Sequence, residues 1–321
     1  MEPKNLTSTV TEFLLLGLTA NRILQYVLFV VFLAICVATW LGNLTIITTV
    51  ITDHRLRTPM YFLLGNLAFI DLSESSVTVP KMLWDLTSQR KVISFGGCMA
   101  QMFFFHFTGG AVVFLLMVMA LDRYVAIHKP LQYLTIMNQT MCVGLVTGAW
   151  LGGFVHSLVQ IVLMIRLPFC GPNTLDNYYC DIPQVIKLAC TNTFILELLM
   201  FSNSGLLTVL IFIILVVSYT IILVKIRVHI TEGKKKALST CVAQITVVCI
   251  HFVPCIFIYA RPFQEFAADK SLSALYTVLT PMLNPLIYTL RNAEMKNAIR
   301  RLLRRIKPLG LPVPAQDRIV P

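Results

Sequence analysis

Seven apolar runs dominate the sequence, and each is long enough to cross a bilayer as a helix. A hydrocarbon core of about 30 Å needs about 20 helical residues, and lipid offers backbone groups no partners, which favours helices over open sheets. Only 13% of the residues are charged, against about 25% in soluble domains. The sequence therefore predicts an all-α membrane protein, a bundle of seven transmembrane helices near residues 24–50, 58–80, 98–121, 141–164, 197–224, 237–260 and 271–290.

The basic residues predict how this bundle is oriented. Most of the 26 lysines and arginines follow the first, third and fifth runs or lie in the C-terminal tail, and such residues mark the cytoplasmic side. The net charge of +11 then reflects topology and contact with anionic membrane lipids, not nucleic-acid binding. We expect an extracellular segment 1–23 with Asn5 glycosylated, a membrane domain 24–290, and a short amphipathic helix and tail in the cytoplasm, 291–321.

The nine cysteines fall into two groups. Those inside the runs are expected to be packing residues: Cys36, Cys142, Cys241, Cys249 and Cys255. The others lie on the predicted extracellular side, where disulfides form: Cys98, Cys170, Cys180 and Cys190. Because three of these share the segment between the fourth and fifth runs, one bridge should tie that segment to the third helix as a lid. Spacing alone does not choose among the three pairings.

Polar residues inside the runs are costly in lipid, which makes each a functional candidate. For Asn43 we favour a hydrogen bond to a neighbouring helix. Asp122-Arg123-Tyr124 ends the third run, and Asn284-Pro285-Leu286-Ile287-Tyr288 lies in the seventh. Together with Cys98 at the start of the third run and Trp150 in the fourth, these motifs resemble those of rhodopsin-like G-protein-coupled receptors.

Four longer motifs narrow the resemblance to the olfactory receptors. They are Pro59–Leu63, Met119–Ile127, Lys236–Cys241 and Pro281–Tyr288, and the similarity runs from about Glu12 to Arg305. It implies an odorant receptor in the plasma membrane of olfactory neuron cilia, without a cofactor. The partners implied are an odorant and the stimulatory olfactory G protein, with cyclic AMP as the output. The implied disulfides are Cys98–Cys180 and Cys170–Cys190.

The motifs suggest a two-state switch at the cytoplasmic face. Asp122 would hold Arg123 at rest, and outward movement of the sixth helix would free Arg123 to meet other groups and the partner. Pro285 removes a backbone hydrogen bond that Asn284 can replace. The predicted switch comprises Asp122, Arg123, Tyr124, Tyr219, Gln244, Asn284, Pro285 and Tyr288.

The chain departs from the family pattern at several positions. The family usually has histidine where Gln244 stands, tyrosine and cysteine where Leu121 and His128 stand, and commonly glutamate at Val112. Because Glu74 lies one helical turn after Asp71, we hypothesise that Glu74 supplies the missing carboxylate of a cation site. A purely structural Glu74, hydrogen-bonded or protonated, is the alternative, and no other metal site is expected.

The family pattern places the ligand between the outer halves of the third, fifth, sixth and seventh helices. His106 is the expected hydrogen-bonding anchor, with Asn203 and Tyr259, and a hydrogen bond to a neighbouring helix is the alternative role for His106. Gly109 and Gly110 either deepen the cavity or let helices pack closely. The expected ligand is small, volatile and mostly apolar, with one oxygen or a similar group. The predicted lining is Phe105, His106, Gly109, Gly110, Ile182, Asn203, Leu207, Phe252, Cys255, Tyr259 and Thr277.

The sequence also bears on three other functions. A rhodopsin-like receptor for a different ligand, such as a metabolite sensed outside the nose, is indistinguishable by sequence. A transporter or channel is disfavoured because no internal repeat is visible. An enzyme is disfavoured because phosphate loops, zinc-protease motifs and serine-nucleophile motifs are lacking.

Overall fold

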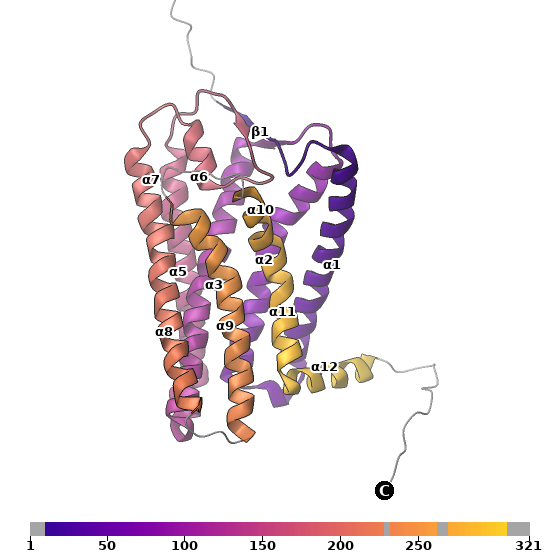
Figure 1. The fold of residues 1–321 in the computed structure, drawn as a ribbon, viewed down its shortest axis with the longest axis vertical. Helices are drawn as coiled ribbons and strands as arrows, with labels where there is room; N and C mark the ends of the chain where they lie inside the picture. Colours follow the sequence, from indigo (N-terminus) through magenta and orange to yellow (C-terminus); the bar gives the residue numbers. More distant parts are fainter. Residues whose placement is uncertain (1–9, 228–231, 262–268, 307–321) are drawn as a thin grey trace, which may run out of the picture.

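Long helices lie side by side along the length of the molecule (Figure 1), in a computed structural model that describes residues 10–227, 232–261 and 269–306. Five crossings of the bundle are continuous helices: α1 (Arg22–Thr52), α2 (Pro59–Thr87), α3 (Phe95–His128), α5 (Gln139–Ile165) and α9 (Glu232–Tyr259). Each extends past the apolar run that predicted it, because a helix does not have to stop where the hydrocarbon ends.

The fifth and seventh crossings each contain a π-helical turn. The fifth consists of α7 (Phe194–Met200), η4 (Phe201–Leu206) and α8 (Leu207–Arg227). The seventh consists of α10 (Asp269–Ala274), η5 (Leu275–Leu279) and α11 (Thr280–Arg291). Such turns insert an extra residue into a helix and are frequent at functional sites.

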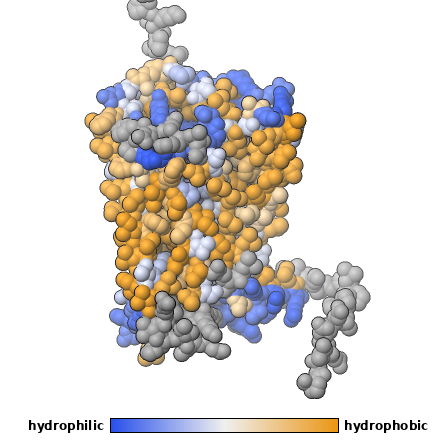
Figure 2. Space-filling view, in the orientation of Figure 1, coloured by the Kyte–Doolittle hydropathy of each residue, from blue (hydrophilic) through white to orange (hydrophobic). Residues whose placement is uncertain are grey.

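The surface of the bundle matches a lipid environment. Figure 2 shows an apolar band around the middle of the visible face, with hydrophilic residues gathered at both ends. By length and composition, α1, α3, α5, α7 to α8, and α9 each contain a stretch that can cross a membrane. The other two crossings do not meet this criterion within the described residues. α2 carries charged residues, and the seventh crossing is divided among α10, η5 and α11. The described residues thus form the predicted seven-helix bundle.

A small sheet at one end was not expected in an all-α chain. Its strands are β1 (Glu12–Leu15), β2 (Val92–Ser94) and β3 (Thr174–Leu175), in the order β2-β1-β3. β1 pairs antiparallel with β2 and parallel with β3. Phe13 is fully buried beside the rings of Phe95 and Phe169. Residues 12–15 are therefore anchored to the loops at this end.

The two ends of the bundle carry different elements. We call the end with the sheet and Cys98 the disulfide end, and the opposite end the Arg123 end. α12 (Ala293–Ile306) lies across the helices at the Arg123 end (Figure 1). It is fastened by an ion pair of 2.6 Å between Arg301 and Asp53, which follows α1. The helix predicted after the seventh crossing is therefore present.

Two features explain how neighbouring helices approach each other. Asn43 donates to the carbonyl oxygen of Pro281 at 3.0 Å, which confirms the helix-bridging role expected for it. α3 and α5 pack closely where Gly110 faces Gly153. The distance between the helices is so short that a Cβ on Gly153 would lie 2.6 Å from backbone atoms of Phe107 and Ala111. Gly110 thus lies at a close contact between the two helices.

Candidate ligand site and activation switch

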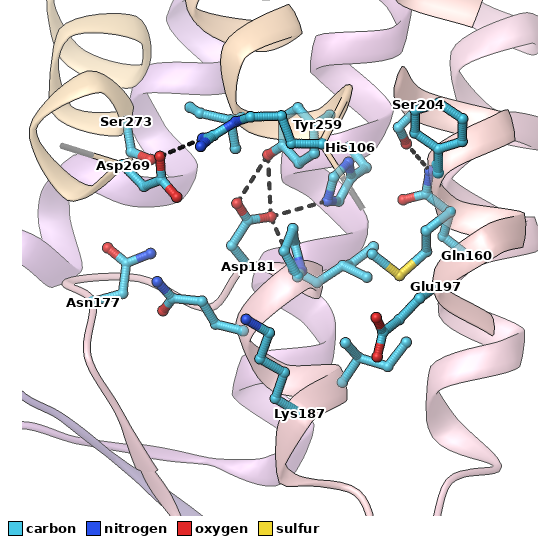
Figure 3. Close-up of a pocket in the computed structure, with 18 residues that line it drawn as sticks. His106, Gln160, Asn177, Asp181, Lys187, Glu197, Ser204, Tyr259, Asp269 and Ser273 are labelled. Atoms are coloured by element: carbon cyan, nitrogen blue, oxygen red, sulfur yellow. Dashed lines mark hydrogen bonds and ion pairs between the residues drawn. The ribbon is translucent and has the colours of Figure 1, made fainter. Parts of the chain in front are cut away.

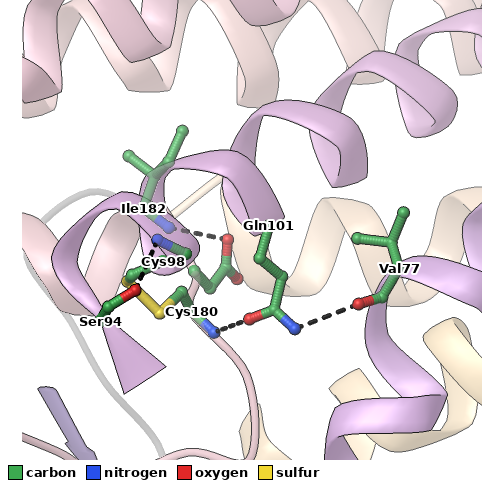
Figure 4. Close-up of a disulfide and its surroundings, with 8 residues drawn as sticks. Val77, Ser94, Cys98, Gln101, Cys180 and Ile182 are labelled. Atoms are coloured by element: carbon green, nitrogen blue, oxygen red, sulfur yellow. Dashed lines mark hydrogen bonds between the residues drawn. A yellow bond between two sulfur atoms is a disulfide. The ribbon is translucent and has the colours of Figure 1, made fainter. Parts of the chain in front are cut away.

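Two disulfides fix the segment between α5 and α7. Cys98 is joined to Cys180, and Cys170 to Cys190, the pairing that the resemblance implied. Cys98 lies in the first turn of α3, so the first bridge holds the segment over the disulfide end of the bundle (Figure 4). We call residues 177–186 the lid; it includes the short helix α6 (Ile182–Val185).

Gln101 reinforces this attachment, one turn after Cys98 (Figure 4). Its side-chain oxygen accepts a hydrogen bond from the backbone N–H of Cys180 at 2.9 Å. Its amide donates to the carbonyl oxygen of Val77 on α2 at 3.2 Å. One amide therefore joins the lid to two helices.

Asp181 is a residue of the lid whose side chain reaches into the bundle, and this side chain is buried. The carboxylate accepts hydrogen bonds from the hydroxyl of Tyr259 on α9, at 3.0 and 3.1 Å, and from that of Tyr179 at 3.1 Å. It also accepts from the backbone N–H of Ile182, at the start of α6. His106 Nε2 on α3 lies 3.4 Å from the same carboxylate (Figure 3). One buried side chain of the lid is thereby hydrogen-bonded to α9 and lies against His106 of α3.

Two tyrosines of the lid also form hydrogen bonds here, and Tyr179 donates its bond to Asp181. Tyr178 shares a hydrogen bond of 2.7 Å with Thr277 in η5. Burial, and then the negative charge of Asp181, raises the pKa of Tyr179 well above its ordinary value. Burial likewise raises the pKa of Tyr178. Both phenols therefore stay protonated at physiological pH.

Two small spaces lie beneath and beside the lid, and both are lined by His106, Ser204 and Tyr259. The lid space, about 60 Å³, includes Asp181 and Ile182 in its wall. The inner space, about 50 Å³, is lined mainly by apolar and aromatic side chains deeper in the bundle. A polar region under the lid thus adjoins an apolar one.

Most of the predicted lining residues meet at these two spaces. The inner space is lined by Phe105, His106, Gly109, Gly110, Leu207, Cys255 and Tyr259, and the lid space by His106, Ile182 and Tyr259. A Cβ on Gly109 would lie 3.2 Å from the hydroxyl of Tyr276, so this glycine leaves room for that side chain.

Three predicted lining residues lie elsewhere. Asn203 faces α5, where it donates to the carbonyl oxygen of His156 at 3.4 Å, because the π turn η4 changes which residues point inward. Its neighbour Ser204 takes the inward position. Phe252 packs against Phe212 with ring centroids 5.6 Å apart. Thr277 is covered by Tyr178.

The structure adds lining residues that the sequence reasoning missed. Asp181 belongs to a loop, outside the apolar runs that supplied the polar candidates. Gln160, His156 and His251 do lie in the runs and would have been found by the same criterion. Gln160 donates to Ser204 and so joins α5 to η4. His251 borders the inner space beside Tyr276, with ring centroids 5.4 Å apart.

At the other end of the bundle Arg123 is paired with Asp122, an arrangement that we call closed. Arg123 donates to Asp122 through Nε at 2.8 Å and through a second guanidinium nitrogen. Asp122 also accepts from the hydroxyl of Tyr133 at 2.7 Å. Tyr133 begins the short helix α4 (Tyr133–Ile136), which connects α3 to α5 after the turn η2 (Pro130–Gln132). Asp122 therefore holds both the arginine and this connection.

The remaining switch residues lie deeper, except one. Tyr219 on α8 donates to Gln244 on α9 at 3.2 Å. Asn284 donates to both oxygens of Asp71, at 2.9 and 3.0 Å. Pro285 packs on Gly42 of α1. The buried hydroxyl of Tyr288 has no hydrogen-bond partner within the described part of the chain.

Tyr124 points away from these residues. Its side chain is exposed and stacks on His128, with ring centroids 4.1 Å apart. The predicted glycosylation site Asn5 lies outside the described residues.

Known proteins resemble this chain over nearly its whole length. The family model described as "Olfactory receptor" matches residues 32–306. Olfactory receptor 4Q3 of Homo sapiens is 56% identical over 312 residues, 97% of this chain and 99% of that protein. Olfactory receptor 4D1 of Homo sapiens is 59% identical and covers 94% of this chain and 97% of its own length. Olfactory receptor 4M1 of Mus musculus is 54% identical, with 95% and 98% covered. The chain belongs to the olfactory receptor family.

Proposed function

We propose that this odorant-sensing, G-protein-coupled receptor binds its ligand in the lid and inner spaces and activates a stimulatory olfactory-type G protein, which raises cyclic AMP. The observation that carries the proposal is the pair of spaces beneath a lid held by the Cys98–Cys180 bridge and Asp181. Membership in a receptor family sets aside an enzyme and a transporter.

The walls of the two spaces support a small ligand of mixed character. Phe105, Leu207 and Cys255 offer apolar contact, while His106 and Tyr259 offer one polar region. The spaces are far smaller than the roughly 300 to 1,000 Å³ of pockets for drug-sized ligands. A volatile molecule of few atoms with one oxygen or similar group fits this description, with limited adjustment of the lid.

The Arg123 end supports coupling to the G protein. Outward movement of α9 would separate Gln244 from Tyr219 and open a space beside Arg123. Arg123 could then leave Asp122 for Tyr219, Tyr288 and an inserted helix of the partner. This is a discrete two-state rearrangement of the kind that signalling needs.

The orientation that this function requires places the disulfide end outside the cell. Residues 1–23 are then extracellular with Asn5 glycosylated, 24–290 form the receptor domain, and 291–321 lie in the cytoplasm. Disulfides favour the oxidising side of the membrane, and the arginines of α12 can contact anionic membrane lipids at the Arg123 end. The plasma membrane of olfactory cilia is the proposed site of action.

The carboxylates of α2 support a cation-sensitive element inside the bundle. Asp71 and Glu74 are both buried, and one oxygen of Glu74 has no partner among the described residues. A bound cation would offset two buried negative charges, whereas a protonated Glu74 would need none.

Glu74→Gln is expected to reduce both the effect of sodium on odorant potency and receptor activation. Asp71→Asn should do the same, because each removes one of the two charges that attract the cation. Dose–response curves with sodium and with choline as the replacement ion measure this effect. Glu74 has only a structural role if Glu74→Gln leaves both properties intact while Asp71→Asn abolishes them.

A cyclic AMP assay in cells that express the olfactory-type G protein tests the proposed function. A panel of small volatile compounds and metabolites should contain at least one that raises cyclic AMP only in receptor-expressing cells. Omission of the G protein should abolish the rise. An odorant-evoked ion current without G protein would contradict the proposal.

A further inference from the structure

A groove outside the ligand site opens on the side of the bundle at the Arg123 end. It lies between the end of α1, the start of α2, the connection α3 to α5 and the start of α5, and its volume is about 610 Å³. That volume lies within the about 300–1,000 Å³ typical of ligand pockets. Most of its wall is apolar, with Val50, Ile51, Phe62 and Leu134 among its residues. In a membrane, lipid is the molecule present to fill it.

The charges at the groove favour one class of lipid. Arg57 lines the groove with an exposed side chain, and no described residue forms an ion pair with it. None of the residues that line the groove is acidic. The groove thus offers an arginine above an apolar wall.

Two long helices start at the same place. α2 begins at the groove with Thr58 and Pro59, and the side chain of Thr58 makes no capping hydrogen bond to that helix. α5 begins there with Gln139, and the side chain of its N-cap residue Asn138 accepts from the backbone N–H of Met141 at 2.9 Å. A helix N-terminus carries a partial positive charge that attracts phosphate groups. Arg57, together with the N-terminus of α2, which lacks a side-chain cap, makes the groove complementary to an anionic headgroup.

We propose that this groove binds an anionic phospholipid. The headgroup lies against Arg57 and Thr58, and an acyl chain lies along the apolar wall. The choice of phospholipid agrees with the proposed orientation, which places the groove in the cytoplasmic leaflet, where anionic lipids are enriched. The site is separate from the odorant spaces, so its occupancy can be measured without knowing the odorant.

The groove is also connected to the predicted switch, through the short helix α4. Leu134 of α4 and Met137, which follows α4, are part of the groove wall. The first residue of the same helix, Tyr133, donates to Asp122. A lipid that holds α4 in place therefore stabilises the hydrogen bond to Asp122 and favours the closed arrangement of Arg123.

Native mass spectrometry of the purified receptor in detergent, titrated with phosphatidylserine, tests the site. Arg57→Gln should weaken phosphatidylserine binding about fivefold, the value of one arginine at an anionic surface, and should leave phosphatidylcholine binding unchanged. Arg55→Gln is the matched control, because Arg55 is exposed in the same connection but does not line the groove. Its binding should equal that of the wild type.

Hydrogen exchange supplies a second measurement that does not depend on signalling. Phosphatidylserine should slow exchange at residues 133–142 in the wild type and in Arg55→Gln, but not in Arg57→Gln. Equal losses in the two arginine variants would show nonspecific charge attraction and overturn the proposal. So would an unchanged Arg57→Gln, or displacement of phosphatidylserine by cholesterol with protection of the same residues, which would make the groove a sterol site.

Discussion

Asp181→Asn is expected to raise the odorant concentration for half-maximal cyclic AMP response by at least about tenfold, the equivalent of one hydrogen bond to a charged group. The carboxylate accepts from two tyrosine hydroxyls and a backbone N–H, and it faces His106. An amide of the same shape replaces one acceptor oxygen with a donor that opposes these donors. The lid is then held less firmly over the ligand.

Asp176→Asn is the matched control for this prediction. Asp176 lies in the same inter-helix segment, but its side chain is 70% exposed and pairs with Lys270 at the surface. Exposed ion pairs contribute about 0 to 1 kcal/mol, so its response should match that of the wild type. Receptor at the cell surface is quantified for both variants. Equal potencies for the two variants would show that the hydrogen bonds of Asp181 do not act on ligand binding.

Gly153→Ala is expected to destabilise the receptor by about 1 to 3 kcal/mol or more, the cost of forcing atoms into a packed interior. The new methyl group would lie 2.6 Å from backbone atoms of α3, which cannot move aside as a side chain does. α3 and α5 would have to separate at the level of the ligand site. Thermal denaturation in detergent and surface expression measure the loss.

Gly148→Ala on the same helix separates this clash from any general effect of alanine. Apart from its chain neighbours and the backbone of its own helix, no heavy atom of the described residues lies within 4 Å of a Cβ built on Gly148. Alanine favours a helix over glycine by about 0.5 to 1 kcal/mol, so Gly148→Ala should be neutral or slightly more stable. If Gly153→Ala behaves in the same way, the close packing of α3 on α5 is not what holds the bundle together there.

The sequence predicted the bundle well because lipid leaves few alternatives for an apolar run. Five of the seven crossings stand out by length and hydropathy alone, whereas α2 and the seventh crossing carry weaker apolar runs. The extent of α2 was underestimated, since Lys81 and Asp85 ended the apolar run although they pair with each other within the helix. The sheet formed by β1, β2 and β3 joins segments far apart in sequence, and such pairing has no local signal.

The site was predicted less completely, for two physical reasons. A helical period of 3.6 residues places Asn203 inward, whereas the π turn η4 turns Ser204 inward instead. Asp181 and Gln101 act through the disulfide, and their roles depend on how the lid folds back on α3. An acidic residue directly after Cys180 was nevertheless a signal, because a bridge to Cys98 brings that residue to the start of α3.

In the proposed mechanism, an odorant bound at the disulfide end releases Arg123 at the other end to engage a stimulatory G protein. Purified receptor reconstituted with the heterotrimer, and an odorant identified in cells, allows nucleotide exchange on the G protein to be measured directly. The odorant should accelerate exchange with the wild type. It should bind Arg123→Ala with unchanged affinity but produce no acceleration. Odorant-dependent exchange that persists in Arg123→Ala would contradict the account.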